Sequence, residues 1–457
     1  MISIIITPSN PTARSPEYLM LTIPGSSNRL CDGISRRDVL KLGALTVGGL
    51  TLADLLRLRA NGVNRSETPH KAIIMVYLNG GPSHMDMYDL KPDAPVEYRG
   101  EFRPIRTNVL GIDICEHMPM QARIADKFSI IRNMRFLQQG HTSPELYTGY
   151  LAGNRPSIGS IVAKLRRDAG VIDSLPPHVS MGDGNHVPRA GFLGRAYESY
   201  QPGERANNLS LANGVTREQL ADRRTLVNSF DTLRRDLDSG RGSLSAMDAF
   251  SAQAFEMVTS NRARDAFDIT REPMHIRNLY GRGTEYLQAR RLVEAGVPVV
   301  TLTPQNHNVP PDCNGQWDHH DHIFTCLPAV LPQYDRSIYA LLTDLHERGL
   351  DQDVAVVVWG EMGRTPRVGT QRGTVAGRDH WPQSGFCLVA GGGLRMGQII
   401  GATDPRGENP RGHAYTPPNV LATLYHVLGT DPATTINDHQ GRPIYLLDHR
   451  ERVAELV

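Results

Sequence analysis

Two loops rich in histidine and aspartate carry the side chains best suited to chemistry. His84 and Asp86 follow a glycine pair, and Asp318 and His320 belong to the dense run WDHHDH. Imidazole and carboxylate groups together suit divalent metal ions or acid–base work. Taken singly, each loop is equally consistent with hydrogen-bonded structural residues. The pattern predicts a functional site only if the loops meet.

Two more loops with the same chemistry occur later in the chain. Glu361 and Arg364 follow one apolar run, and Asp379 and His380 precede the next. Arg364 is a candidate to bind an anionic ester oxygen. A divalent cation needs oxygen and nitrogen ligands gathered from several loops. We therefore predict a divalent metal site (Zn, Ca or Mg) formed by His84, Asp86, Asp318, His320, Glu361, Asp379 and His380.

Candidate hydroxyl nucleophiles stand next to His141. Thr142 and Ser143 open a predicted helix, and free amides at a helix N-terminus can hold an anionic ester. The alternative is a simple helix cap followed by Pro144 in the first turn. If the segment is catalytic, Thr142 or Ser143 attacks the ester. His141 and Arg364 then stabilise charge or protonate the leaving group.

Short apolar runs alternate with helical patterns and must position these loops. Strands are predicted at residues 71–78, 128–131, 297–303, 354–359 and 386–390. Helices are predicted at residues 158–167, 218–237, 285–295, 323–348 and 419–428. This alternation favours an α/β fold with a doubly wound, mostly parallel sheet and helices on both faces. Ligand sites in such sheets lie at the carboxyl ends of the strands.

The first 60 residues have the features of an export signal. Residues 35–41 contain the pair Arg36-Arg37 of a twin-arginine motif, and the apolar run at 42–56 is too short for a stable membrane span. A cleavage site near Ala60 fits this interpretation; the alternative is a surface arginine pair before a helix. We expect the twin-arginine export machinery to deliver the chain to the periplasm or the exterior. Residues 61–457 then form the mature domain, with a polar helical insertion at about 205–270.

The net charge bears on the class of partner, and the cysteines bear on metal, redox and disulfide chemistry. The net charge of +1 at pH 7 gives no reason to expect nucleic acid. Four cysteines fall within residues 61–457, namely Cys115, Cys313, Cys326 and Cys387. Their spacing indicates neither a zinc knuckle nor a redox pair. Disulfides and buried free thiols both remain open.

Several long motifs resemble a bacterial family known as domain of unknown function 1501. They include GGPSHMDMYDLKPDAP (80–95), WDHHDHIF (317–324), VVVWGEMGRTP (356–366) and GRDHWP (377–382). That family is placed with the alkaline phosphatase and sulfatase superfamily. The resemblance implies an alkaline phosphatase-like doubly wound sheet with a metal-assisted site that cleaves phosphate or sulfate esters.

The resemblance carries over to particular residues only in part. Asp318 and His320 look like the Asp and His that hold one metal in the superfamily, and His380 looks like its late metal-binding His. Glu361-Met362 stands where the superfamily usually has an Asp-His pair. The segment Cys326-Leu327-Pro328-Ala329-Val330 lacks the Arg of a formylglycine sulfatase motif.

These observations lead to two functional expectations. The first is an exported, metal-dependent hydrolase of sulfate or phosphate esters, with an anionic ester substrate such as a sulfated polysaccharide. The second is a non-catalytic binding or envelope protein that keeps the fold without the chemistry. The departure at Glu361-Met362 supports the second.

Overall fold

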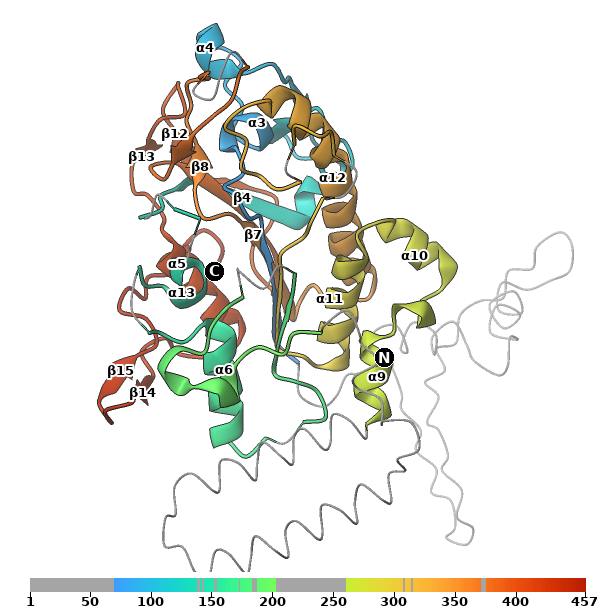
Figure 1. Cartoon of the computed structure of the whole chain (residues 1–457), viewed down its shortest axis with the longest axis vertical. Helices are drawn as coiled ribbons and strands as arrows, with labels where there is room; N and C mark the ends of the chain where they lie inside the picture. The colour runs from blue at the N-terminus through green and yellow to red at the C-terminus, as the bar shows by residue number, and fades with distance from the viewer. Residues whose placement is uncertain are drawn as a thin grey trace, which may run out of the picture. The chain divides into compact units, whose positions relative to one another are not determined.

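A seven-stranded sheet forms the centre of the computed structural model (Figure 1). The structure describes residues 70–137, 140–141, 144–151, 154–171, 173–182, 187–202, 260–306, 309–313, 315–370 and 375–457. The strand order is β11-β4-β10-β7-β1-β6-β5. The strands are β1 (Ala72–Tyr77), β4 (Phe128–Met134), β5 (His178–Met181), β6 (Val299–Leu302), β7 (Val354–Trp359), β10 (Gly385–Gly391) and β11 (Ile399–Ile400).

Most neighbouring strands in this sheet are parallel. Strands β7, β1, β6 and β5 run in one direction, whereas β10 is antiparallel to both β7 and β4. The mostly parallel sheet predicted from the sequence is confirmed, with β10 as its exception. Because β10 is reversed, the segment that precedes it lies at the edge where the parallel strands end. That reversal brings residues 377–382 to the same edge as the other candidate loops.

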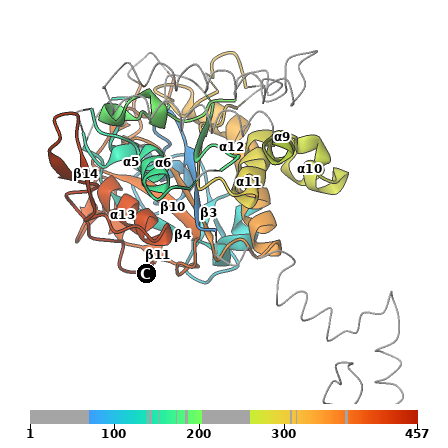
Figure 2. The same ribbon diagram turned by 90° about the horizontal axis from the view of Figure 1, so that it is seen from below.

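Helices cover both faces of the sheet (Figure 2), as predicted. The strands are mostly apolar, and their apolar side chains alternate between two separate cores. In β1, Ile74 packs into one core and Ile73 into the other, and both are fully buried. Burial of each such side chain contributes about 1.5–3 kcal/mol. One core contains α11 (Thr284–Ala295) and α12 (Ile323–Glu347); the other contains α6 (Ile158–Asp168) and α13 (Pro417–Val427).

Smaller elements complete the described part of the chain. The short helices are α3 (His84–Met87), α4 (Val96–Arg99), α5 (Pro144–Thr148), α9 (Asn261–Phe267) and α10 (Met274–Tyr280), and the 3-10 turns are η1 (Gln121–Lys127), η3 (Gly191–Leu193), η4 (Arg195–Tyr197) and η6 (Ile269–Arg271). The two-stranded pairs are β2 (Pro104–Arg106) with β3 (Asp113–Cys115), β8 (Gly363–Arg364) with β9 (His380–Trp381), β12 (Ala402–Thr403) with β13 (Pro410–Arg411), and β14 (Thr435–Asn437) with β15 (Pro443–Tyr445). Among the described residues, no helix is both long enough and apolar enough to span a bilayer.

The five predicted strands and four of the five predicted helices are present. Strand β5 was not predicted, because HVSM is too short and mixed to stand out from its surroundings. The helix predicted at 218–237, most of the insertion at 205–270 and the export signal at 1–60 lie outside the described residues. Those three predictions therefore stay predictions.

A disulfide joins Cys313 to Cys326, which are 13 residues apart. Cys115 and Cys387 are buried free thiols, so both alternatives left open by the sequence occur in this chain. The closed loop lies between β6 and the first turn of α12 and carries Asp318 and His320. The crosslink therefore restricts the segment that contributes most to the candidate site.

Removing this crosslink should destabilise the protein. We expect the double variant C313S/C326S to lose about 3 kcal/mol of unfolding free energy, because a loop of roughly this length is no longer restrained in the unfolded chain. Denaturant unfolding followed by circular dichroism measures this. Reductant should lower the midpoint of the wild type and leave the double variant unchanged. Equal midpoints for the oxidised wild type and the double variant would contradict the expectation.

Candidate metal centre

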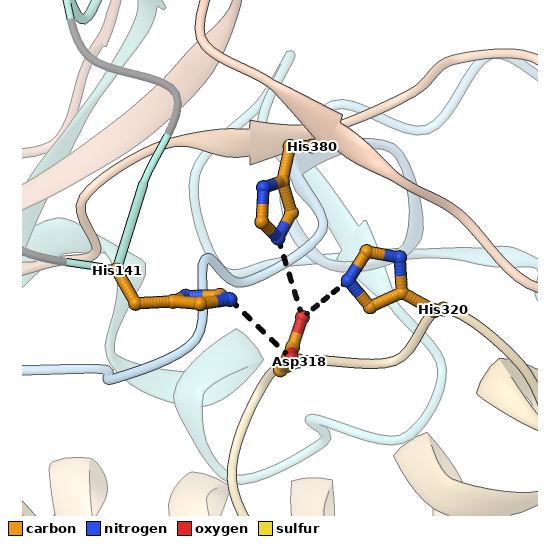
Figure 3. Close-up of side chains that lie close together, drawn as sticks. All are labelled: His141, Asp318, His320 and His380. Atoms are coloured by element: carbon orange, nitrogen blue, oxygen red, sulfur yellow. Dashed lines mark ion pairs between the residues drawn. The ribbon is translucent and has the colours of Figure 1, made fainter.

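Three imidazoles surround one carboxylate at the carboxyl edge of the sheet (Figure 3). His141, Asp318, His320 and His380 each offer a ligand atom, and all four atoms lie within 4.8 Å of one another. The Nε2 atoms of His320, His141 and His380 lie 3.0, 3.4 and 3.6 Å from the Asp318 carboxylate oxygens. All three rings thus direct the same nitrogen, Nε2, toward the Asp318 carboxylate.

The four residues come from three loops that the strand directions bring together. His141 follows β4, Asp318 and His320 follow β6, and His380 begins β9 just before the reversed strand β10. These three loops lie far apart in the sequence, at residues 141, 318–320 and 380. The expectation that distant loops converge at the carboxyl edge is therefore met for these four residues.

The loop after β6 is docked tightly on the end of β1. The backbone N–H of Trp317 donates a hydrogen bond to the backbone carbonyl of Asn79 at 3.0 Å. Gly80 has φ of +109°, and a Cβ there would lie 2.5 Å from the Asp318 backbone nitrogen. Only glycine fits this conformation and this close approach. Gly80 therefore allows the Asp318 backbone to approach the end of β1.

Arg364 lies behind Asp318 and is fully buried. Its guanidinium donates to Asp318 Oδ1 and to the carbonyls of Gly80, Gly81 and Arg378. Burial raises the pKa of Asp318, but the hydrogen bond with His141 and the charge of Arg364 outweigh it and hold that pKa well below its usual range. This geometry favours a role for Arg364 in keeping Asp318 ionised, in place of the predicted contact with an ester oxygen.

Glu361 contacts a cluster residue from outside the cluster. Its carboxylate is fully buried, accepts the Gly80 N–H at 3.0 and 3.3 Å, and lies 2.8 Å from His141 Nδ1. Hydrogen bonds to Asp318 and Glu361 raise the pKa of His141 to about 9. Glu361, predicted as a ligand, thus lies on the far side of the His141 ring from Asp318.

Asp379 has the same relation to His320. Asp379 Oδ1 forms a short hydrogen bond with His320 Nδ1, on the ring edge opposite Asp318. The Asp379 backbone is held in turn by Thr365, whose Oγ1 accepts the Asp379 N–H at 2.9 Å. Asp379, also predicted as a ligand, therefore supports a cluster imidazole from behind.

The predicted pair after β1 does not join the cluster. Both Asp86 oxygens accept from the buried Arg378 guanidinium, at 2.7 and 3.1 Å, and Ser83 Oγ donates to the same carboxylate at 2.5 Å. His84 is fully buried with Nε2 3.0 Å from the Gly407 carbonyl. His84 and Asp86 belong to the short helix α3, which follows the glycine pair, and both side chains are buried in the protein. In this structure, Asp86 instead anchors Arg378, the neighbour of Asp379.

His141 is the cluster residue whose role the sequence placed differently. It was predicted as a catalytic group beside the nucleophile, whereas its ring lies against Asp318 and His380 (Figure 3). The available signal was its position after a predicted strand at 128–131, the same signal that selected the other loops. Thr142 and Ser143 lie outside the described residues, so their role as nucleophile stays a prediction.

The donor set fits a metal ion by its chemistry and its spacing. Four ligands around a tetrahedral zinc ion at about 2.0–2.1 Å are separated from one another by about 3.3 Å. The contacts between the three Nε2 atoms and the two Asp318 oxygens span 3.0 to 3.6 Å, and the four ligand atoms lie within 4.8 Å of one another, which is within about 1.5 Å of that spacing. Three imidazoles with one carboxylate suit zinc and similar divalent transition metals better than Ca²⁺ or Mg²⁺, which prefer oxygen ligands.

Comparisons with known proteins place these features in context. No curated protein matches the sequence. Among solved structures, the PsFucS1 sulfatase from Pseudoalteromonas sp. is 11% identical with a TM-score of 0.34, covering 83% of this chain and 70% of that chain. The lipoteichoic acid synthase LtaP from Listeria monocytogenes is 10% identical with a TM-score of 0.33, covering 87% and 81%. The phosphonate monoester hydrolase SpPMH from Silicibacter pomeroyi is 11% identical with a TM-score of 0.33, covering 80% and 74%.

Structural similarities at these TM-scores do not identify the function of the site. The sequence match is firmer, because it extends over nearly all of the chain beyond the predicted export signal. Residues 70–457 match the family described as "Protein of unknown function (DUF1501)". The chain therefore belongs to the DUF1501 family.

Proposed function

We propose that this protein is a zinc-dependent hydrolase of sulfate or phosphate esters. The observation that carries the proposal is the convergence of three imidazole Nε2 atoms on the ionised Asp318 at the carboxyl edge of the sheet. Ligand sites in doubly wound sheets lie at this edge. The four side chains are between 11% and 36% exposed, so an ester in solution can reach them.

The residues divide naturally into roles. His141, Asp318, His320 and His380 would hold the cation, which when bound supplies positive charge to polarise an ester oxygen. His141 is the most exposed of the four, with 36% of its side chain accessible, and is therefore the least firmly enclosed. If a protein nucleophile is used, Thr142 or Ser143 is the candidate, because these two residues directly follow His141 in the sequence. An anionic ester, including a sulfated polysaccharide, would be attracted to a cation at this position.

The residues favour one cation at this position over a pair. At the position where the resemblance leads one to expect an Asp-His pair, Glu361 is engaged by Gly80 and His141. Met362 is 1% exposed and belongs to the apolar core that also contains α13. Neither side chain is free to serve a second metal, so we propose a mononuclear centre.

A second candidate is a metal-stabilised binding protein without turnover. The buried Met362, in place of the second histidine, favours it, because a site with one cation has less charge with which to activate an ester. Both candidates are proposed to act outside the cytoplasm, since the sequence pattern at residues 1–60 predicts twin-arginine export. Ester turnover by the zinc-loaded protein separates the two.

The purified protein should bind about one equivalent of zinc. We expect His320→Ala to lower zinc affinity by at least about 100-fold, because it removes a ligand whose ring is held on both edges. Asp318→Ala should do the same. Metal analysis with chelator competition measures affinity, and a panel of aryl sulfate and phosphate esters measures turnover.

The control for this experiment is His346→Ala. His346 is an exposed histidine hydrogen-bonded to Asp351, away from the cluster, so the variant should bind zinc and act like the wild type. Absence of stoichiometric zinc in the wild type would overturn the proposed function. Full zinc binding without turnover of any ester would favour the binding protein.

Zinc affinity should rise with pH up to about 9. The raised pKa of His141 means that both nitrogens of this ring carry hydrogen at neutral pH in the metal-free protein, so that the ring is cationic. Zinc must displace one of these protons, so the affinity increases by up to about tenfold per pH unit until the proton is lost. For the same reason, His141 stabilises the metal-free fold below its ordinary pKa of 6.5, and this contribution disappears as the pH rises through about 9.

Chelator competition at pH 7, 8 and 9 measures this dependence. In His141→Ala the slope between pH 7 and 9 should be shallower, since the displaced proton is absent. An affinity that is flat across this range in the wild type would contradict a cationic His141 in the metal-free protein.

A further inference from the structure

Two carboxylates contact the cluster from behind, each at the Nδ1 atom of a different imidazole. Glu361 lies 2.8 Å from His141 Nδ1, and Asp379 forms a short hydrogen bond with His320 Nδ1. In both rings, the opposite nitrogen, Nε2, faces Asp318. Each ring is therefore held between an outer carboxylate and the centre of the cluster.

We propose that Glu361 and Asp379 are positioning residues that set the tautomer and the orientation of His141 and His320. A carboxylate only accepts hydrogen bonds, so Nδ1 of each ring must carry the hydrogen. In a neutral imidazole, Nε2 then has its lone pair free and aimed at the centre. This inference rests on the proposed function, in that a cation must occupy the cluster.

Glu361 is fixed well enough to play this part. It is fully buried and lies two residues after the end of β7, and both of its oxygens also accept the backbone N–H of Gly80. The same carboxylate thus links the ends of β7 and β1 to the ring of His141. A group held by two elements of the sheet cannot swing into the cluster without breaking those contacts.

Asp379 is fixed by a different element, the β8–β9 hairpin. Arg364 pairs with His380 in this hairpin, and Thr365 exchanges hydrogen bonds with Asp379 at 2.8 and 2.9 Å. Arg378, next in sequence, is fully buried and bound to Asp86. The hairpin therefore presents His380 to the cluster and places Asp379 behind His320.

Replacing either carboxylate by its amide separates positioning from packing. In Glu361→Gln and Asp379→Asn the side chain keeps its size, but its NH₂ group can donate to Nδ1. The imidazole can then place its own hydrogen on Nε2, where it opposes a cation. We expect each variant to bind zinc about 10–100-fold more weakly than the wild type, the range found for outer partners of metal-binding histidines.

Asp335→Asn is the matched control. Asp335 is a carboxylate that is 2% exposed and accepts the backbone N–H groups of Met120 and Gln121, at 2.8 and 2.7 Å. It contacts the η1 segment and no residue of the cluster. The Asp335→Asn variant should be less stable than the wild type. Its zinc affinity should stay within about twofold of the wild-type value, which is the scatter of the measurement.

The experiment measures zinc dissociation constants by chelator competition for the full chain and the three variants. If the wild type binds zinc but Glu361→Gln and Asp379→Asn bind it equally well, the positioning inference is wrong and the proposed function stands. If the wild type binds no zinc, the proposed function itself fails. Weaker binding in the two amide variants, with Asp335→Asn unchanged, supports the inference.

A second measurement needs no variant and covers the case in which one fails to fold. Nitrogen-15 spectra of histidine-labelled, zinc-loaded wild type report which ring nitrogen binds metal and which carries hydrogen. We expect His141 and His320 to bind through Nε2 and to be protonated at Nδ1. Metal on Nδ1, or hydrogen absent from it, would overturn the assignment.

Discussion

The ionised carboxylate of Asp318 is the interaction on which the candidate site depends. A buried Arg364 donates to it from behind, while three imidazoles approach it from the front. Two further carboxylates, Glu361 and Asp379, lie behind two of those imidazoles. Three acidic groups against one guanidinium leave an excess of negative charge at the cluster. Such a set is costly to bury unless protons or a cation compensate it.

The fold supplies the convergence that this charge arrangement requires. Parallel strands that end at one edge deliver Glu361 and the loops bearing His141, Asp318 and His320, and the reversal of β10 delivers Asp379 and His380. Backbone contacts then lock the loops together, above all the approach of Asp318 to Gly80. Two apolar cores pack against the sheet from both sides and fix the strands whose ends carry these loops.

The fold could be predicted because buried strands leave a strong apolar signal, and the candidate loops could be predicted because they follow those strands. The sequence could not separate inner from outer residues: His141, Glu361 and Asp379 all follow or precede a strand, yet only His141 faces the cluster. It also could not show that Asp86 is neutralised by Arg378, a partner 292 residues away. Such distinctions depend on side-chain direction and long-range pairing, which periodicity does not encode.

Three imidazoles and the Asp318 carboxylate are proposed to form one zinc site. X-ray absorption at the zinc edge of the loaded protein identifies the atoms that surround the ion. We expect a shell of nitrogen and oxygen at about 2.0–2.1 Å with the multiple-scattering signature of several imidazoles. A shell containing sulfur, or one of oxygen atoms alone without imidazole, would contradict it.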